Sequence, residues 1–104
     1  ACTDGINWYK EKGLWFENSN DFFPVSGDII FFDWKNKTTG EQDGISDHVG
    51  IVKSYDFESR TIHTIEGNSG DECRERTYNK DDVQILGFGS NRIHFIQEID
   101  SSIT

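Results

Sequence analysis

The sequence predicts a single small α+β domain in which one N-terminal helix precedes an antiparallel sheet. Three observations support this fold class. A helix-like segment occurs only near the N-terminus, short apolar runs of strand length recur after it, and turn-forming residues separate those runs. The length of 104 residues suits one domain.

The helix is predicted over residues 3–13, TDGINWYKEKG. Thr3 or Asp4 is expected to cap its N-terminus, and Gly13 is expected to end it. The segment that follows, 14–23, mixes aromatic and polar residues and is predicted to be a loop, and 24–27 is predicted to be a turn. Aromatic rings of a small domain pack in its core by default, and this is expected of Trp8, Trp15 and Trp34, with the lining of a sugar or peptide groove as the alternative.

The strands are predicted where apolar or alternating residues run for four to eight positions. They are placed at 28–34, 48–55, 60–66, 74–78 and 84–88, with a further candidate at 93–96. Polar loops are predicted at 35–46 and 67–71. The strands 48–55 and 60–66 are expected to form a hairpin. Residues 1–96 are assigned to the domain, and 97–104 to a C-terminal tail.

Charge and hydropathy exclude several classes of partner. The net charge is −9 and the pI is near 4.6, so the chain is not expected to bind nucleic acid or an anionic membrane through charge. The longest apolar run, Ile29 to Phe32, is far too short to span a membrane. The N-terminal residues have neither the basic nor the apolar region of a signal peptide.

The predicted hairpin places two titratable residues together. His48 begins its first strand, and Glu66 ends the second. Such positions are neighbours across an antiparallel pair. A carboxylate beside one imidazole nitrogen fixes the tautomer and leaves the other nitrogen as a base, which is half of a catalytic triad. The competing interpretation is a polar strand end beside a Glu-Gly-Asn-Ser turn.

The acidic loop and the cysteines allow more than one interpretation. The acidic loop is interpreted as a solvated surface, with calcium binding as the alternative, and includes Asp33, Glu41, Asp43 and Asp47. Cys2 and Cys73 fit no metal-binding pattern, and a disulfide between them is left open. Cys2 precedes a helix, a place where the dipole lowers a thiol pKa. No cofactor and no metal is assigned.

Three ordered segments resemble the CHAP family of cysteine- and histidine-dependent amidohydrolases and peptidases, in the NlpC-type, papain-like group. They are Gly-Asp-Ile-Ile-Phe-Phe-Asp from Gly27, Asp-His-Val-Gly-Ile-Val from Asp47 and Ile-Glu-Gly-Asn-Ser from Ile65. Arg-x-Arg-x-Tyr at 74–78 and Gly-Phe-Gly at 87–89 also fit. The resemblance covers about residues 3–89, and it is the ordered set of motifs that is specific.

The resemblance implies a papain-like α+β fold and cleavage of an amide or peptide bond in peptidoglycan through a thioester. His48 would be the general base, Glu66 would orient it, and Asn68 would be a polar helper. The partner would be the peptidoglycan stem peptide. The protein would be secreted or cell wall-associated, from a bacterium or a phage.

One part of the family pattern is not found in the chain. In the family the nucleophilic cysteine begins a helix well upstream of the Gly-Asp strand, and Cys2 lies too close to Gly27. The chain is therefore expected to be a partial domain, incomplete at its N-terminus and inactive alone. An upstream Cys-bearing segment, or another chain, is expected to cover the sheet. The alternative is a non-catalytic CHAP-like module that binds wall peptide or a partner protein.

Overall fold

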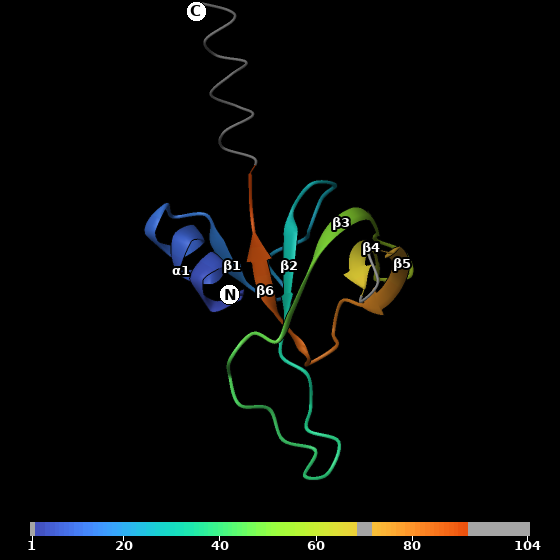
Figure 1. Ribbon diagram of the computed structural model, residues 1–104. Coiled ribbons are helices and arrows are strands. Elements are labelled where there is room, and N and C mark those ends of the chain that lie inside the picture. The colour runs from blue at the N-terminus through green and yellow to red at the C-terminus, as the bar shows by residue number, and fades with distance from the viewer. Residues whose placement is uncertain (1, 69–71, 92–104) are drawn as a thin grey trace, which may run out of the picture.

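The computed structural model describes residues 2–68 and 72–91, without the side chains of Cys2, Thr3 and Asn68. It contains one helix followed by strands that form one sheet (Figure 1). The elements are α1 (Cys2–Glu11), β1 (Trp15–Glu17), β2 (Ile29–Phe32), β3 (His48–Asp56), β4 (Thr61–Asn68), β5 (Glu72–Asn79) and β6 (Ile85–Gly89). In this part of the chain, no helix has the length and apolar character needed to cross a membrane.

Helix α1 ends where the sequence predicts. Gly13 adopts a left-handed backbone with φ of 71°, which costs glycine little because it has no Cβ. The amide of Leu14 then donates to the carbonyl of Tyr9 at 2.8 Å. This bond satisfies a carbonyl of the last helical turn and directs the chain into β1.

The sheet has the strand order β1-β6-β2-β3-β4-β5, and each pair of neighbours is antiparallel. Side chains alternate between its two faces. The side that we name the core face carries the buried cluster of Phe22, Ile30, Phe32, Val52, Ile62, Ile85 and Phe88.

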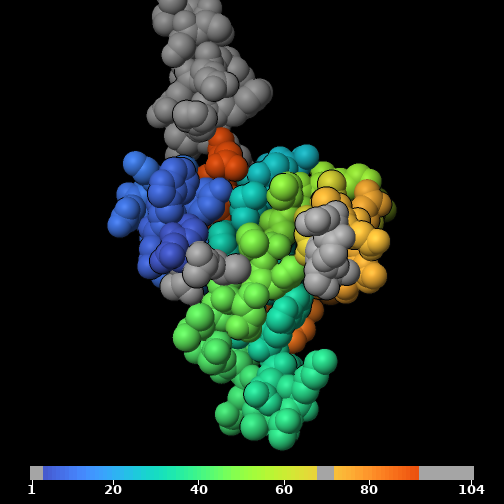
Figure 2. All heavy atoms as spheres, viewed as in Figure 1, coloured from blue at the N-terminus to red at the C-terminus, as the bar shows by residue number. Residues whose placement is uncertain are grey.

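The opposite side, which we name the helix face, is only partly covered. α1 packs on it over Phe31, which is 3% exposed, and Tyr9 of α1 lies directly against Gly89 of β6. Beside α1, atoms of β3 lie at the surface (Figure 2), and apolar side chains of β3 and β4 are exposed there. Val49 is 37% exposed, Ile51 is 49% exposed and Ile65 is 36% exposed. We name these three residues the apolar patch.

Two predicted loops are wrong in part. Residues 15–17 form β1, because their backbone pairs with β6 at a point where Gly87 has no Cβ to obstruct the approach of Phe16. Residues 67 and 68, predicted to belong to a loop, are part of β4, because β4 stays paired with β5 as far as Asn68 and Glu72, and 69–71 lie outside the described residues. The candidate strand at 93–96 and the tail at 97–104 lie outside the described residues.

The expectation for the tryptophans is also only partly correct. Trp15 is half-buried and packs against Phe31, with ring centroids 5.4 Å apart. Trp34 is half-buried as well and packs on the edge of the core cluster. Trp8 is 50% exposed on the outer side of α1, so it is not a core residue.

Candidate active site

His48 and Glu66 form the centre of the site. The register of β3 on β4 pairs Ile51 with Ile65 and Val52 with Thr64, so His48 and Glu66 both point to the core face. The Nε2 atom of His48 lies 2.6 Å from Oε1 of Glu66. The prediction that these side chains reach hydrogen-bonding distance is confirmed.

The second carboxylate oxygen of Glu66 is held by two hydroxyl groups. Thr64 Oγ1 donates to Oε2 at 2.6 Å, and Tyr78 Oη donates to the same atom at 2.7 Å. Glu66 is 3% exposed. Burial acts to raise the pKa of Glu66, but the hydrogen bonds from Thr64, Tyr78 and His48 outweigh it, and the pKa is lowered from its ordinary value. Glu66 is therefore an anion at neutral pH, fixed on both oxygens.

The pKa of Tyr78 is shifted in the opposite direction to that of Glu66. Burial, followed by its hydrogen bond to the Glu66 carboxylate, raises the pKa of Tyr78 far above the ordinary value for a phenol. It therefore stays protonated, and the phenol acts as a permanent donor to Glu66.

Glycine at position 50 makes room for this carboxylate. A Cβ at Gly50 would lie 2.8 Å from Cγ of Glu66, closer than carbon atoms can pack. Gly50 lies between His48 and Val52 on the core face, directly across from Glu66. A side chain there would displace the carboxylate that contacts the imidazole.

Aromatic rings hold the imidazole from the other side. Trp34 stacks on His48 with centroids 5.6 Å apart and an interplanar angle of 27°, and Phe32 lies 5.8 Å away. The His48 side chain remains 28% exposed. The ring is thus fixed in orientation but still reachable.

The exposed part of His48 faces a cavity of about 290 Å³, which is lined by Trp34, His48, Glu66, Gly67, Arg74 and Arg76. Arg76 Nε is 3.9 Å from Glu66 Oε1, whereas Arg74 has no ion-pair partner among the described residues. Both guanidinium groups are charged at every relevant pH. A chain with a net charge of −9 therefore has a cationic wall at this cavity.

The contacts determine what the imidazole can do. Ionised Glu66 only accepts hydrogen bonds, so Nε2 of neutral His48 carries the proton and Nδ1 carries the lone pair. Nδ1 has no hydrogen-bond partner among the described residues. The ring is therefore arranged to take a proton at Nδ1, and the fixed anion stabilises the resulting imidazolium.

The other predicted residues are placed less completely. Asn68 belongs to β4 and pairs with Glu72, but its side chain lies outside the described residues. Cys2 begins α1, and its side chain is likewise outside them. Cys73 is a free, exposed thiol, so it forms no disulfide with Cys2 in this structure. Cys73 pairs with Gly67, one position from Arg74, and so points to the helix face.

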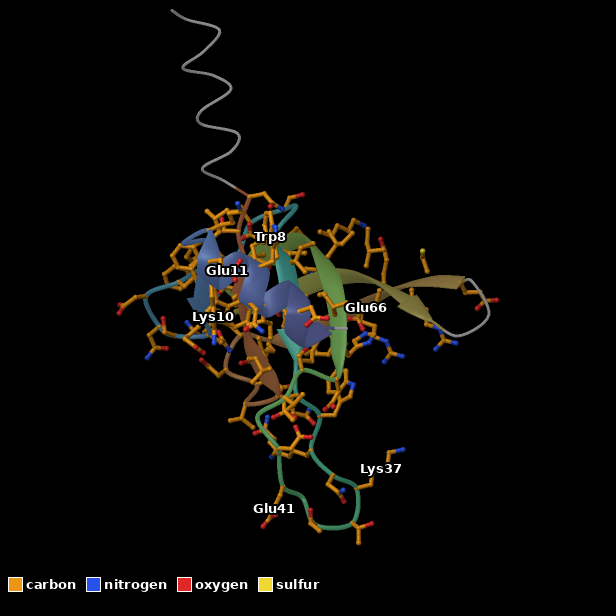
Figure 3. All side chains as sticks on the ribbon, turned by 60° about the vertical axis from the view of Figure 1, so that its left-hand side comes forward. Trp8, Lys10, Glu11, Lys37, Glu41 and Glu66 are labelled. Carbon is orange, nitrogen blue, oxygen red and sulfur yellow. The ribbon has the colours of Figure 1, made fainter. Side chains whose placement is uncertain are left out.

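The sequence led us to expect that the whole acidic loop is solvated, and this is wrong for one of its residues. Glu41, Asp43 and Asp47 are exposed, but Asp33 is only 1% exposed. The oxygens of Asp33, Asp43 and Asp47 approach within 4.8 Å of one another and are a potential cation-binding group. Glu41 is not part of the group and lies near the tip of the loop with Lys37 (Figure 3).

Several residues around His48 were not predicted to belong to the site. They are Thr64, Tyr78, Arg74 and Arg76, together with Trp34, for which a groove was only the alternative to core packing. The spacing of Arg-x-Arg-x-Tyr is the signal that could have found three of them. Positions two apart on a strand share a face, and β5 lies beside β4, so that face meets Glu66.

Comparison with known proteins adds one positive finding. The sequence model of the CHAP domain family matches residues 1–68, which is more than half of the chain. No curated protein and no solved structure matches.

Proposed function

The chain belongs to the CHAP domain family, and from this we propose that it carries the base-bearing part of a papain-like peptidoglycan hydrolase, an amidase or endopeptidase. CHAP domains are generally cysteine- and histidine-dependent amidohydrolases or peptidases, related at a coarse level to peptidoglycan. The observation that carries the proposal is the 2.6 Å contact between His48 Nε2 and the buried Glu66 carboxylate.

In the proposed reaction, His48 Nδ1 takes the proton of a cysteine thiol. The thiolate attacks the carbonyl carbon of the scissile amide and forms a tetrahedral intermediate. The C–N bond breaks as imidazolium returns the proton to the leaving amine, and a thioester remains. Water, deprotonated by His48, hydrolyses the thioester and restores the thiol. Glu66 orients the ring throughout, and Asn68 is assigned as a polar helper.

The proposed nucleophile is a cysteine from a segment that precedes Ala1. Neither cysteine of the chain is favoured by its position. Cys73 is on the helix face, away from His48. Cys2 begins a helix that packs on Phe31, also on the helix face. This supports a domain that is incomplete within residues 1–104, assigned to 1–96 with a tail at 97–104.

The apolar patch supports the same proposal. Val49, Ile51 and Ile65 form a continuous surface, since Ile51 and Ile65 are direct partners across β3 and β4. α1 covers only the neighbouring part of the helix face (Figure 1). We assign the uncovered part to the upstream segment, which would bury the patch against its own apolar side chains. Because His48 is the first residue of β3, the cysteine of this segment would have to reach past that end of the strand to the core face.

The cationic wall favours a substrate that carries a carboxylate. Arg74 and Arg76 line the cavity beside His48, and a guanidinium pairs with carboxylates in a bidentate manner. Peptidoglycan stem peptides carry carboxylates, so they fit this wall. Such a substrate places the protein outside the cytoplasm, secreted or bound to the wall, in a bacterium or a phage. The net charge of −9 does not attract the protein to an anionic wall. Another module would therefore be needed to attach it to the wall.

The test compares residues 1–104 with a version extended upstream through the expected cysteine helix, using purified peptidoglycan. We expect release of soluble fragments only from the extended version, and loss of release when its helix-start cysteine or His48 is changed to alanine. Robust cleavage by residues 1–104 alone would overturn the proposal and make Cys2 the first suspect. Binding without cleavage by the extended version would instead favour the non-catalytic wall-binding module.

A further inference from the structure

Three carboxylates converge at the base of the loop between β2 and β3. Asp33 follows β2, Asp47 precedes β3, and the amide of Asp47 donates to the carbonyl of Phe32 at 2.8 Å. This backbone bond keeps the two ends of the loop together, and the loop returns to them at Asp43. Oxygens of Asp33, Asp43 and Asp47 all lie within 4.8 Å of one another.

Asp33 is the unusual member of the group. It is only 1% exposed. Its Oδ2 accepts a hydrogen bond from the amide of Gly44 at 2.7 Å, but its Oδ1 is buried and has no hydrogen-bond partner among the described residues. A buried carboxylate oxygen without a partner is costly in free energy.

A cation would relieve this cost directly. Calcium binds carboxylate and carbonyl oxygens at about 2.4 Å, so two of its ligands lie at most about 4.8 Å apart. The three aspartates meet this limit as they stand. Asp43 and Asp47 also line an open cavity of about 560 Å³, through which water can complete the six to eight ligands that calcium takes.

We propose that Asp33, Asp43 and Asp47 bind a calcium ion. This inference does not rest on the proposed function, because it uses only the loop's own carboxylates. The hydrogen bonds in the loop support it: Ile45 donates its amide to Asp43 Oδ1 at 2.9 Å, and Gly44 turns the chain with φ of 78°. These contacts hold the Asp43 carboxylate at the point where the loop turns back toward Asp33. Glu41 lies near the tip of the loop and is not a ligand (Figure 3).

The ion would brace the residues that hold the imidazole. Trp34, which stacks on His48, follows Asp33 and donates its amide to Asp47 Oδ2 at 3.0 Å. His48 itself follows Asp47. The calcium would therefore connect the end of β2 to the start of β3 and fix the spacing of Trp34 and His48. In this arrangement the three aspartates are positioning residues, and the ion does not touch the reacting atoms.

The test uses residues 1–104 and the metal alone. Terbium, which replaces calcium, should luminesce when a tryptophan near the loop is excited, and calcium should displace it. Calcium should also raise the melting temperature relative to the same protein in a chelator. We expect Asp43→Asn and Asp47→Asn each to weaken calcium binding at least tenfold and to abolish the thermal shift. Asparagine keeps a carbonyl oxygen for the loop's hydrogen bonds, so these exposed variants should fold.

Two control variants separate the site from general acidity. Glu41→Gln and Asp56→Asn each remove one exposed acidic charge outside the group and should leave calcium affinity within about twofold of the wild type. Asp33→Asn should lose the thermal shift as well. An unchanged melting temperature on calcium addition, equal stabilisation by magnesium, or binding that survives in the Asp43→Asn/Asp47→Asn double variant would each overturn the calcium site.

Discussion

The imidazole of His48 and the carboxylate of Glu66 are joined by one 2.6 Å contact, made through Nε2 of the ring and Oε1 of the acid. The other oxygen of Glu66 is held by Thr64 and Tyr78, so the acid cannot turn away from the ring. This arrangement leaves Nδ1 as the ring nitrogen without a hydrogen-bond partner among the described residues.

The first prediction concerns the tautomer of His48. At a pH where the ring is neutral, the proton should reside on Nε2, because the ionised Glu66 only accepts. Long-range nitrogen–proton correlation NMR distinguishes the two ring nitrogens. Glu66→Gln should shift the population toward the other tautomer, since the amide can also donate. A wild-type ring protonated mainly on Nδ1 would contradict the assignment.

The second prediction uses a pair of glycines. Gly50→Ala should displace Glu66, because the new Cβ would lie 2.8 Å from its Cγ. We expect a loss of stability of about 1–3 kcal/mol from overpacking, and a loss of wall cleavage by the extended, active version. Gly67→Ala is the matched control for stability, since a Cβ there meets nothing within 4 Å. Equal effects of the two substitutions would argue against steric displacement.

The third prediction concerns pH and stability. The pKa of Glu66 is lower in the folded protein than in the unfolded chain, so its contribution to stability is present above the ordinary carboxyl pKa and is lost as pH falls through the folded pKa. Wild type should exceed Glu66→Gln by about 1–3 kcal/mol at pH 7. The difference should shrink below about pH 4.

Denaturant unfolding across that pH range measures this difference. Glu75→Gln is a suitable control, because Glu75 pairs with Lys53 on an exposed surface and should change stability little. A difference between wild type and Glu66→Gln that stays constant from pH 7 to pH 3 would show that the charge of Glu66 is not what stabilises the fold.

The fourth prediction concerns the cationic wall. Arg74→Gln and Arg76→Gln should raise KM for peptidoglycan fragments in the extended version, each by about tenfold, with a smaller change in kcat. Removal of the substrate carboxylate should make wild type resemble the variants. Arg60→Gln is the control, because Arg60 pairs with Asp81 beyond the opposite end of β4. A KM rise in Arg60→Gln of the same size would point to general charge and not to the cavity.

Much of the fold follows from local pattern. The apolar run at 29–32 and the alternation along 61–66 indicate strands, because neighbouring side chains of a strand point to opposite faces. The same alternation, with a short turn between the strands, predicts the hairpin of β3 and β4, but a register shift between Val52 and Ser54 is what places His48 on the face of Glu66. Gly13 ends the helix because its backbone tolerates a positive φ. Each of these features depends on residues close together in the sequence.

The remaining features needed the tertiary structure. β1 forms only because a distant strand, β6, accepts its backbone at Gly87. The burial of Asp33 and the stacking of Trp34 on His48 depend on how a long loop folds back on the sheet. The support of Glu66 by Tyr78 requires β5 to lie beside β4 in one particular register. Local sequence determines how side chains alternate along a strand, but the register between strands and the contacts between distant segments decide what each side chain meets.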